Sequence, residues 1–379
     1  MSLFDFFKKK EISVVGIDIG ASSIKVVQLK KHKGVAVLET YGELSLGPYF
    51  GAEIGQATNL PASKIAEALN DLLIEANVTA KKAGVSIPFS SSLISLILMP
   101  PLNPKNLSSM IPIEARKYIP VPISEVTLDW FVIPDEDFSF KEDYDSDGQI
   151  SKDSVKKKED DKKMKVLLVA IHNDILNKYN EIINGTDLAI GFFEIEIFSA
   201  IRAVVEQSIT PTMVIDMGAR DTKLYIVEFG IIKSSHVINS GAQNITQTLS
   251  KSLSITIPKA EEFKRKAGVT ESFGDNKIID SRDVIIPALE RIFTEANRVM
   301  TQYQQKNNKN IGNVILTGGG AIMKGILPVA EKYFETNIML SNPFSKTKAP
   351  AFLEEILKEV GPGFAVAVGL ALRRLQEID

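Results

Sequence analysis

The fold of this chain is constrained most by an internal repeat that relates its two halves. Near the N-terminus the chain reads VVGIDIGASSIKVVQLKKHKGVAVLETYGEL, and in the second half it reads MVIDMGARDTKLYIVEFGIIKSSHVINSGA. When Asp18 is aligned with Asp216, at an offset of 198 residues, three further residue types coincide: Gly20 with Gly218, Ala21 with Ala219, and Lys25 with Lys223. The repeat therefore predicts two copies of one structural unit.

Each copy predicts a three-stranded meander. Apolar and β-branched runs alternate with short turns that contain glycine or charged residues. Turns this short favour antiparallel pairing of neighbouring strands. The predicted strands are Val14–Ile19, Ile24–Leu29 and Val35–Thr40 in the first copy, and Met213–Met217, Lys223–Phe229 and Ile232–Ile238 in the second.

The first turn of each copy, D-x-G-A, has the composition of a phosphate-binding loop. A glycine at its tip permits positive φ and lets a phosphate approach the backbone N–H groups. Asp18 and Asp216 would repel a phosphate directly, so we expect them to hold the water shell of a Mg²⁺ ion. Nearby side chains add hydroxyl donors and positive charge: Ser22, Ser23, Thr222 and Lys25. The alternative is a pair of ordinary hairpins with D-x-G turns, which are common singly but less expected at matching places in both halves.

A third glycine-rich element follows a short predicted strand, Asn313–Thr317. Gly318, Gly319 and Gly320 come next, and we expect a helix after them. In such an arrangement a nucleotide can approach the backbone closely. The pattern G-x-G-x-x-G is not met, because Met323 occupies the last glycine position, and no G-x-x-x-x-G-K-[ST] occurs. A dinucleotide-binding motif and a P-loop are therefore not indicated.

These motifs resemble those of a known superfamily. DIGASSIK, DMGARDTK and LTGGGA resemble, in this order and spacing, the two phosphate loops and the adenosine loop of the actin, sugar-kinase and heat-shock-chaperone superfamily. NSGAQNITQTLSKSLSITIPKAEEFKR resembles the segment after the second loop in FtsA and in the PilM family of type IV pilus assembly proteins. The resemblance implies an α/β fold, namely an actin-like (ribonuclease H-like) duplicated two-domain fold that binds ATP and Mg²⁺.

The same resemblance implies which residues bind the nucleotide. Gly241 opens a helix, and Glu261 and Lys264 share one face of a later helix because they are three residues apart. The resemblance places these two on the ribose or adenine, and a surface ion pair is the alternative. The implied cofactor-binding residues are Asp18, Gly20, Ala21, Ser22, Ser23, Lys25, Asp216, Gly218, Ala219, Thr222, Gly241, Glu261, Lys264, Gly318, Gly319 and Gly320, with Asp18 and Asp216 on the metal side.

ATP hydrolysis also needs a group that orients the attacking water. The resemblance points to Glu196, which occupies the position of a glutamate that precedes a proline in bacterial actins. Here Ile197 replaces that proline, and Glu194 is a second candidate. A structural alternative is a glutamate that the helix dipole favours at a helix N-terminus. We therefore expect ATP binding with slow or no hydrolysis.

The segment GVSIPFSSSLISLILMPPLNPKNLSSMIPIEARKYIPVPISEVTLDWFVI resembles the insert subdomain that PilM and FtsA carry. Within it we expect a strand pair or buried strand over Ile87–Leu102 and a helix over Met110–Tyr118. The predicted organisation is a first actin-like domain (1–80), the insert subdomain (81–185), a connecting segment of the first domain (186–210), the second actin-like domain (211–360) and a C-terminal helix that returns to the first domain (361–379).

Residues 135–163 differ in composition from the rest of the chain. Many charges and few apolar residues predict a flexible loop between a strand that ends at Ile133 and one that starts at Met164. Asp143, Asp145 and Asp147 match the start of a calcium-binding loop, residues 143–154. Position twelve of that loop is Ser154 where glutamate is required, so a solvated linker is the favoured reading and Ca²⁺ binding the alternative.

Composition excludes several classes of function. A net charge of −3 argues against nucleic acid as a general partner, and the lack of cysteine excludes disulfides and thiolate chemistry. No apolar run is long enough to span a bilayer. In MSLFDFFKKK the lysines follow the apolar residues, whereas in a secretory signal the positive charges come first. We therefore expect a cytoplasmic protein, with that N-terminal segment as a frayed tail or a contact with a membrane or partner.

Three functions remain open. The first is an ATP-dependent assembly platform on the inner face of the cytoplasmic membrane, which by resemblance binds the N-terminal cytoplasmic peptide of a PilN-like membrane protein and the pilus motor components. Its peptide groove is expected near the strands of Val85–Met99. The second is a polymerising division protein like FtsA, and self-association is possible for any actin fold. The third is a small-molecule kinase, for which no carboxylate motif is evident.

Overall fold

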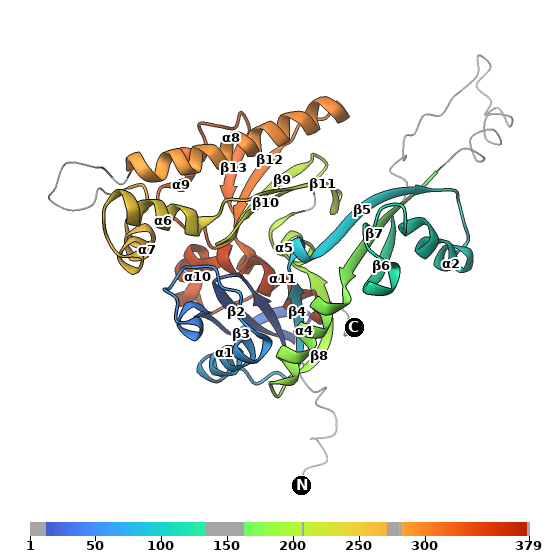
Figure 1. Cartoon of the computed structure of the whole chain (residues 1–379), viewed down its shortest axis with the longest axis horizontal. Coiled ribbons are helices and arrows are strands. Elements are labelled where there is room, and N and C mark those ends of the chain that lie inside the picture. The colour runs from blue at the N-terminus through green and yellow to red at the C-terminus, as the bar shows by residue number, and fades with distance from the viewer. Residues whose placement is uncertain (1–12, 134–162, 207, 271–279, 281, 377–379) are drawn as a thin grey trace, which may run out of the picture. The chain divides into compact units, whose positions relative to one another are not determined.

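The computed structural model describes residues 13–133, 163–206, 208–270, 280 and 282–376. The N-terminal MSLFDFFKKK and the loop 143–154, with its calcium hypothesis, lie outside the described residues. By internal contacts the chain divides into two compact units, one formed by Met1–Ile87 with Asn180–Asp379 and the other by Pro88–Tyr179. Figure 1 shows the elements of both units.

The larger unit contains two five-stranded sheets with the same topology. The first sheet has the order β3-β2-β1-β4-β8, and the second has the order β11-β10-β9-β12-β13. In each sheet an antiparallel meander is followed by two strands parallel to its first strand. The strands are β1 (Ser13–Ile19), β2 (Ser23–His32), β3 (Val35–Ser45), β4 (Lys82–Ile87) and β8 (Ala189–Ile195), and β9 (Thr212–Met217), β10 (Thr222–Glu228), β11 (Ile231–Ile238), β12 (Asn313–Thr317) and β13 (Asn337–Leu340).

The two predicted meanders are therefore confirmed, and the repeat in the sequence is a repeat in topology. The first sheet with its helices forms the first half of the larger unit, and the second sheet with its helices forms the second half. The helices are α1 (Ala62–Glu75), α4 (Asn173–Asn184), α5 (Glu196–Val204), α6 (Ala242–Ser252), α7 (Ile257–Lys266), α8 (Arg282–Asn307), α9 (Ile326–Ala330), α10 (Glu354–Val360) and α11 (Ala365–Gln376).

The C-terminal helix α11 closes the core of the first half. A Cβ on Gly16 of β1 would lie 2.0 Å from the carbonyl oxygen of Ala367, so the strand and the helix touch backbone to backbone. A Cβ on Gly42 would instead meet Leu72 of α1 at 2.9 Å, so α1 covers the opposite face of the same sheet. Helix α11 therefore packs on the sheet of the first half.

Among its described residues, the smaller unit is a three-stranded antiparallel sheet with a helix packed on one face. Its order is β5-β7-β6, and its apolar core lies between the sheet and the helix. The elements are β5 (Ser92–Met99), α2 (Pro104–Ala115), β6 (Val126–Ile133) and β7 (Met164–His172). The predicted strands on either side of the charged insertion thus pair directly with each other.

Three predicted elements differ from those observed. Ile87–Leu102 holds one edge strand, β5, whose Leu96 and Leu98 are 45% and 53% exposed, rather than a strand pair or a buried strand. The helix predicted over Met110–Tyr118 begins earlier, because Asn103 caps its N-terminus and Pro104 occupies its first position. After Gly318–Gly320 the chain makes turns, and the helix α9 begins only after Gly325.

Among the described residues, no helix combines the length and the apolar character needed to cross a bilayer.

Candidate functional site

The two repeated turns have the same hydrogen-bond geometry. The backbone N–H of Gly20 donates to the carbonyl of Ser23 at 3.0 Å, and the N–H of Gly218 donates to the carbonyl of Asp221 at 2.9 Å. These bonds join residues that the offset of the repeat also aligns. The strand registers agree as well, since Asp18 lies opposite Lys25 and Asp216 lies opposite Lys223.

The carboxyl group of Asp18 is shielded from solvent among charged side chains. Burial raises its pKa to about 6, although Lys25 opposes that shift. Ser86 of β4 donates to the Asp18 carboxylate at 2.9 Å, and this bond also lowers the pKa. The charge of Glu196 raises the pKa of Asp18 and the charge of Lys223 lowers it. A lysine of the second half therefore interacts electrostatically with an aspartate of the first half. The two turns therefore approach one shared electrostatic centre.

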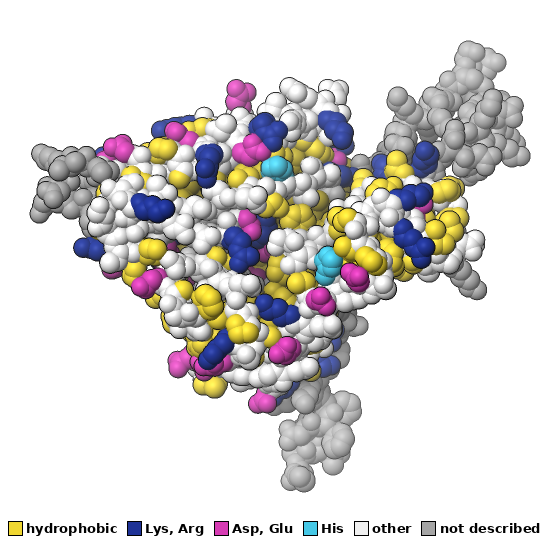
Figure 2. Space-filling view, viewed as in Figure 1, with side chains coloured by type: hydrophobic (Ala, Val, Ile, Leu, Met, Phe, Trp, Pro, Cys, Tyr) yellow, Lys and Arg dark blue, Asp and Glu magenta, His cyan; other side chains and the backbone are white. Residues whose placement is uncertain are grey.

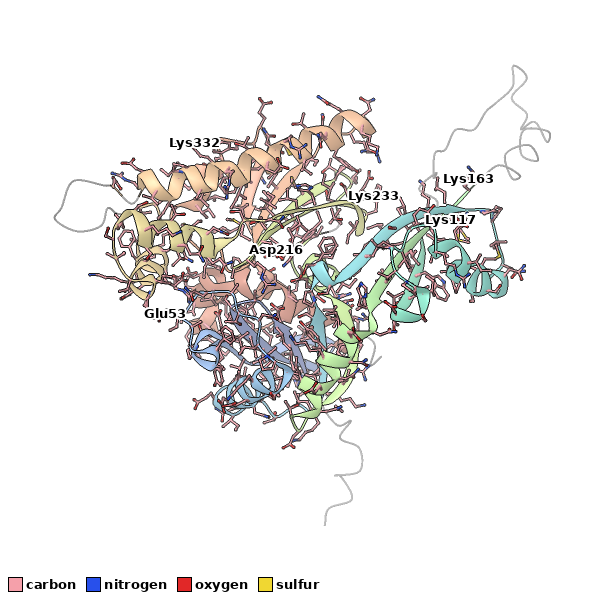
Figure 3. All side chains as sticks on the ribbon, viewed as in Figure 1. Glu53, Lys117, Lys163, Asp216, Lys233 and Lys332 are labelled. Atoms are coloured by element: carbon pink, nitrogen blue, oxygen red, sulfur yellow. The ribbon has the colours of Figure 1, made fainter. Side chains whose placement is uncertain are left out.

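That centre is organised by Lys223. Its ammonium lies 2.8 Å from the Glu196 carboxylate, 3.6 Å from Asp216 and 3.8 Å from Asp221. Burial alone would lower the pKa of Lys223, but these three carboxylates together raise it above its usual range. Burial raises the pKa of Asp216 in spite of Lys223. Figure 3 labels Asp216 in the sheet of the second half.

The glycine-rich loop after β12 meets the same aspartate. Gly318 has φ +85°, and a Cβ there would lie 2.4 Å from Oδ1 of Asp216. The N–H of Gly320 donates to the carbonyl of Met217 at 2.7 Å. Gly319 has nothing within 4 Å of the position where a Cβ would be. The loop is therefore held against the second turn at both ends while its middle residue is open to a ligand.

Gly241 locks the second turn to helix α6. It is the N-cap of α6, and a Cβ there would lie 2.5 Å from the carbonyl oxygen of Ala219. The first N–H of the helix, at Ala242, donates to the carbonyl of Gly218 at 2.9 Å. The N-terminus of α6 thus adjoins the phosphate-type turn, where its N–H groups and dipole favour an anion.

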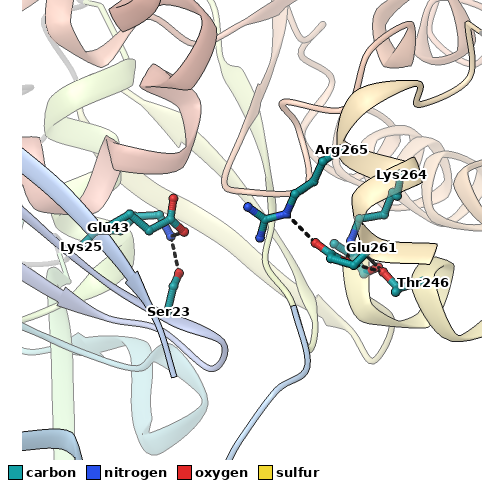
Figure 4. A network of polar contacts seen from close by, with 8 residues as sticks. Ser23, Lys25, Glu43, Thr246, Glu261, Lys264 and Arg265 are labelled. Atoms are coloured by element: carbon teal, nitrogen blue, oxygen red, sulfur yellow. Dashed lines mark hydrogen bonds and ion pairs between the residues drawn. The ribbon is translucent and has the colours of Figure 1, made fainter. Parts of the chain in front are cut away.

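Glu261 and Lys264 form an ion pair that is buried, not on the surface (Figure 4). Their charged groups are 2.6 Å apart and the residues are 4% and 6% exposed, which corrects the alternative of a surface pair. Thr246 of α6 donates to Glu261 at 2.6 Å, and Arg265 donates to it at 2.7 Å. Burial alone would raise the pKa of Glu261, but Lys264, Thr246 and Arg265 lower it. Such a compact polar group offers both donors and acceptors to a ribose or a base.

Lys25 has a matching polar group in the first half (Figure 4). Its ammonium donates to Ser23 at 2.8 Å and lies 3.1 Å from Glu43. Burial alone would raise the pKa of Glu43, but Lys25, Ser23 and, from the second half, Arg265 lower it. Lys25 is 9% exposed, and its Cε would lie 3.6 Å from a Cβ on Gly363. Charges on both halves thus interact across the site.

A strap, defined as residues 51–60, leads to α1 of the first half and contacts the second half along its length. Thr58 donates through its N–H to the carbonyl of Ala21 at 2.8 Å, beside the first turn. Ala57 donates through its N–H to the side chain of Gln243 of α6 at 3.0 Å, and Arg220 donates to the carbonyl of Thr58. A Cβ on Gly55 would lie 2.4 Å from the Glu261 carboxyl carbon. The strap therefore links both turns to the Glu261 group.

Two predicted hydroxyl donors have other partners. Thr222 is fully buried and donates to the carbonyl of Ser240 at 2.8 Å, so it stabilises the turn rather than offering a free donor. Ser23 accepts from Lys25. The carbonyl of Ser22 accepts from Leu46, which anchors the first turn to the segment that precedes the strap.

One family model and one solved structure match nearly the whole of this chain. A family model described as "Type IV pilus assembly protein PilM" matches residues 16–143 and 150–375. This chain belongs to the PilM family. The solved structure of a PilM-PilN type IV pilus biogenesis complex is similar in fold, with a TM-score of 0.76, 23% identity, and coverage of 96% of this chain and 98% of that one. The PilM fold is actin-like, and the predicted fold class is confirmed.

This chain is also similar to proteins outside the PilM family. FtsA cell division proteins are similar over part of the chain: that of Helicobacter pylori strain 26695 is 31% identical over 182 residues, and that of Neisseria meningitidis is 32% identical over 176 residues. These matches cover 42% and 41% of this chain, and 36% and 41% of the FtsA proteins. The ethanolamine utilization protein EutJ of Carboxydothermus hydrogenoformans has a similar fold, with a TM-score of 0.54 and 14% identity over 95% of this chain and 89% of that one.

Within this PilM-family chain, the structure separates the two glutamates that were candidates for orienting water. Glu196 begins α5 and pairs with Lys223 in the shared centre. Glu194 instead accepts from Ser199, from Arg202 at 2.7 and 2.8 Å, and from Arg373 at 2.8 Å. Burial alone would raise the pKa of Glu194, but these partners lower it. Glu194 therefore joins β8, α5 and α11, and Glu196 is the remaining candidate.

The site contains residues that the sequence motifs did not single out. Lys223 was aligned with Lys25 by the repeat, and that alignment was the available signal for it. Ser86 reaches the site from β4 and Arg220 from the second turn, and neither was among the predicted binding residues. Their roles depend on strand pairing between distant segments.

The donor set fits a magnesium ion that is bound through few protein groups. Among the described residues no cluster of three or more carboxylate, histidine or cysteine side chains could hold a metal alone. Mg²⁺ commonly keeps several waters and binds through one or two carboxylates plus phosphate oxygens. Asp18 and Asp216, one from each half, match that requirement.

Proposed function

We propose that this chain is an ATP-binding assembly platform of a type IV pilus inner-membrane complex. The observation that carries this proposal is the meeting of two turns of equivalent geometry, one from each half, at the centre of Asp18, Asp216 and Lys223. Backbone N–H groups of the turns and of α6 would take the phosphates, and Lys25 and Lys223 would supply positive charge. The Glu261 group would take the ribose or adenine.

Calorimetry of ATP binding tests this site. We expect Asp18→Ala and Asp216→Ala each to weaken Mg·ATP binding at least roughly tenfold, which corresponds to about 1.4 kcal/mol. Asp187→Ala removes an exposed aspartate of the same unit and should leave the affinity unchanged. Full affinity in both site variants would disprove the nucleotide site.

We propose slow or no hydrolysis at this site. Glu196 is the residue that would orient water, and any magnesium supplied with the nucleotide would neutralise developing charge on the phosphates. In the chain as it stands, the Glu196 carboxylate already pairs with the Lys223 ammonium at 2.8 Å. A carboxylate held by a lysine is a weaker acceptor for a water proton, which favours binding over turnover.

The partner we propose is the N-terminal cytoplasmic peptide of a PilN-like membrane protein. The smaller unit offers an apolar surface for it on the sheet face that α2 does not cover. Leu96, Leu167 and Phe131 form one cross-strand row there, because Leu167 lies opposite both others in the register. Leu96 and Phe131 are 45% and 57% exposed, and Leu98 beside them is 53% exposed. Figure 2 shows hydrophobic side chains gathered over this unit.

Peptide binding to this row has a direct test. Leu96→Ser and Phe131→Ser should each weaken binding of the PilN-like peptide by roughly tenfold, as loss of a buried apolar side chain implies. Phe352→Ser is the matched control, since Phe352 is 79% exposed but belongs to the larger unit. Equal effects of all three substitutions would show that the row is not the docking surface.

Through this peptide the protein would be recruited to the inner face of the cytoplasmic membrane. An FtsA-like polymerising protein is the second candidate, because FtsA proteins are up to 32% identical to part of this chain. Light scattering with and without Mg·ATP separates the two, since filaments scatter strongly and a platform bound to one peptide does not.

A further inference from the structure

Tyr225 is a buried polar side chain that the proposed nucleotide site has not yet used. It lies in β10, two residues after Lys223, so both side chains are on the same face of the strand. It is 1% exposed, and among the described residues its hydroxyl has no hydrogen-bond partner. A buried hydroxyl without a partner costs free energy, so an interaction outside the free protein is expected to satisfy it.

The repeat shows that the fold does not require a hydroxyl at this position. The offset of 198 residues aligns Tyr225 with Val27 of β2, which is fully buried in the equivalent strand of the first half. A valine therefore suffices for packing in one copy. The tyrosine occurs in the copy whose strand also carries the Lys223–Glu196 pair. This asymmetry connects the hydroxyl with the chemistry of the second half.

The charges around Tyr225 define what its hydroxyl can do. Burial raises the pKa of Tyr225 well above its usual range, and Asp216 and Glu196 raise it further. The phenol therefore stays protonated at physiological pH and can donate one hydrogen bond. Both neighbouring carboxylates accept hydrogen bonds only, and neither is hydrogen-bonded to the hydroxyl. A water molecule is the group that can accept from the phenol while donating to such a carboxylate.

We propose that Tyr225 is a positioning residue of the magnesium-nucleotide site, whose hydroxyl donates to a water that Asp216 and Glu196 hold beside the metal. This inference rests on the proposed function. It assigns to Tyr225 an effect that appears only when magnesium and nucleotide are bound. Among the described residues no protein group accepts from the hydroxyl, and in the loaded protein it contributes one water-mediated hydrogen bond.

The test is Tyr225→Phe, which removes the hydroxyl and keeps the ring. ATP affinity is measured by calorimetry with excess Mg²⁺ and again with EDTA, for the wild-type protein and the variant. The variant should lose roughly 2- to 10-fold in affinity with Mg²⁺, the usual worth of one hydrogen bond, and keep its affinity in EDTA. Its unfolding midpoint without ligand should stay the same or rise, because an unsatisfied hydroxyl has been removed.

Tyr333→Phe is the matched control. Tyr333 packs against Phe293 of α8, on the helix-covered side of the same sheet. The ATP affinity of Tyr333→Phe should therefore equal that of the wild-type protein, both with Mg²⁺ and with EDTA. If the wild-type protein binds no Mg·ATP, the proposed function fails. If the wild-type protein binds and Tyr225→Phe has an unchanged ratio of the two affinities, only this inference is overturned. A lower unfolding midpoint with that unchanged ratio would assign the hydroxyl to the fold.

Discussion

Asp18 and Asp216 are kept in surroundings that oppose their charge. In both cases burial is the largest influence on the pKa and raises it, and the neighbouring lysines compensate only in part. Buried carboxylates with raised pKa values are common where a cation or a substrate is bound. The free protein is therefore less stable than it would be with neutral side chains at these two positions, and a bound magnesium ion would reverse that relation.

Asp18→Asn should therefore stabilise the protein without ligand at neutral pH. The pKa of Asp18 is about 6 in the folded chain against a reference value of 3.8, so its ionisation opposes folding. The penalty is absent below the reference pKa, grows as the pH rises, and is complete above the folded pKa. We expect a gain of roughly 1–3 kcal/mol at pH 7 by denaturant unfolding, allowing for partial solvent screening.

With Mg·ATP bound, Asp18→Asn should lose this advantage in stability. Mg·ATP should stabilise the wild-type protein more than Asp18→Asn, and the wild-type affinity should rise between pH 5 and 7 as Asp18 loses its proton. Asp187→Asn is the control, since an exposed carboxylate gives neither effect. A loss of stability in Asp18→Asn at pH 7 would contradict the raised pKa.

At the scale of elements, the strap of residues 51–60 is the feature that connects the two halves beside the site. It touches the first turn at Ala21, helix α6 at Gln243 and helix α7 at Glu261. A nucleotide held between the turns and the Glu261 group would lie beside these contacts. We therefore expect the strap to slow the release of a bound nucleotide.

Gly55→Ala tests the strap. Gly55 has φ +86°, and the added Cβ would lie 2.4 Å from the Glu261 carboxyl carbon, so either the strap or the Glu261 side chain must shift and the contact between them is lost. Stopped-flow release of a fluorescent ATP analogue should become at least roughly threefold faster, about 0.7 kcal/mol. Gly34→Ala carries a similar backbone strain at φ +79° but meets nothing within 4 Å, so its release rate should be normal. Equal rates in both variants would exclude the strap from nucleotide retention.

In helix α11, we expect the replacement of a glycine by alanine to lower the stability of the protein. Alanine in place of glycine within a helix normally stabilises it by about 1 kcal/mol. At Gly369 of α11 the new Cβ would lie 1.8 Å from the carbonyl oxygen of Ser199, and that oxygen belongs to the backbone of α5. Gly369→Ala should therefore destabilise the protein by roughly 1–3 kcal/mol in a urea titration. A gain in stability would show that the two helices can move apart freely.

At the scale of the whole molecule, the two compact units carry two different proposed functions. The proposed nucleotide site lies entirely within the larger unit, and the apolar row lies entirely within the smaller one. A ligand that binds only the folded state of one unit suppresses its local opening. The two proposed ligands should therefore protect different segments of the chain.

Hydrogen exchange can measure this separation. Mg·ATP should slow amide exchange in β9, β10 and α7, and a PilN-like peptide should slow exchange in β5 and β7. If ATP also protects β5 and β7 in the absence of peptide, the two sites are coupled, and each ligand must then change the affinity of the other by the same factor. Protection of the same segments by both ligands would contradict separate sites.

The sequence by itself determined the duplicated part of the fold. Antiparallel meanders follow from local signals, namely alternating strands and short glycine turns, so both copies and their common geometry were predictable. The same local signals marked Asp18, Asp216 and the three glycines after β12. Prediction was weaker for Ile87–Leu102, because an apolar run does not reveal whether a strand lies at the edge of a sheet or inside it.

Only the tertiary structure decided which charged groups face one another. Glu194 and Glu196 are two residues apart in sequence, yet one is enclosed by Arg202 and Arg373 and the other pairs with Lys223. The partners lie 8, 179 and 27 residues away along the chain, so no local pattern distinguishes the two glutamates. The buried Tyr225 hydroxyl and the strap became visible for the same reason. Spacing along the chain sets the strands and turns, whereas burial and long-range pairing set the chemistry of their side chains.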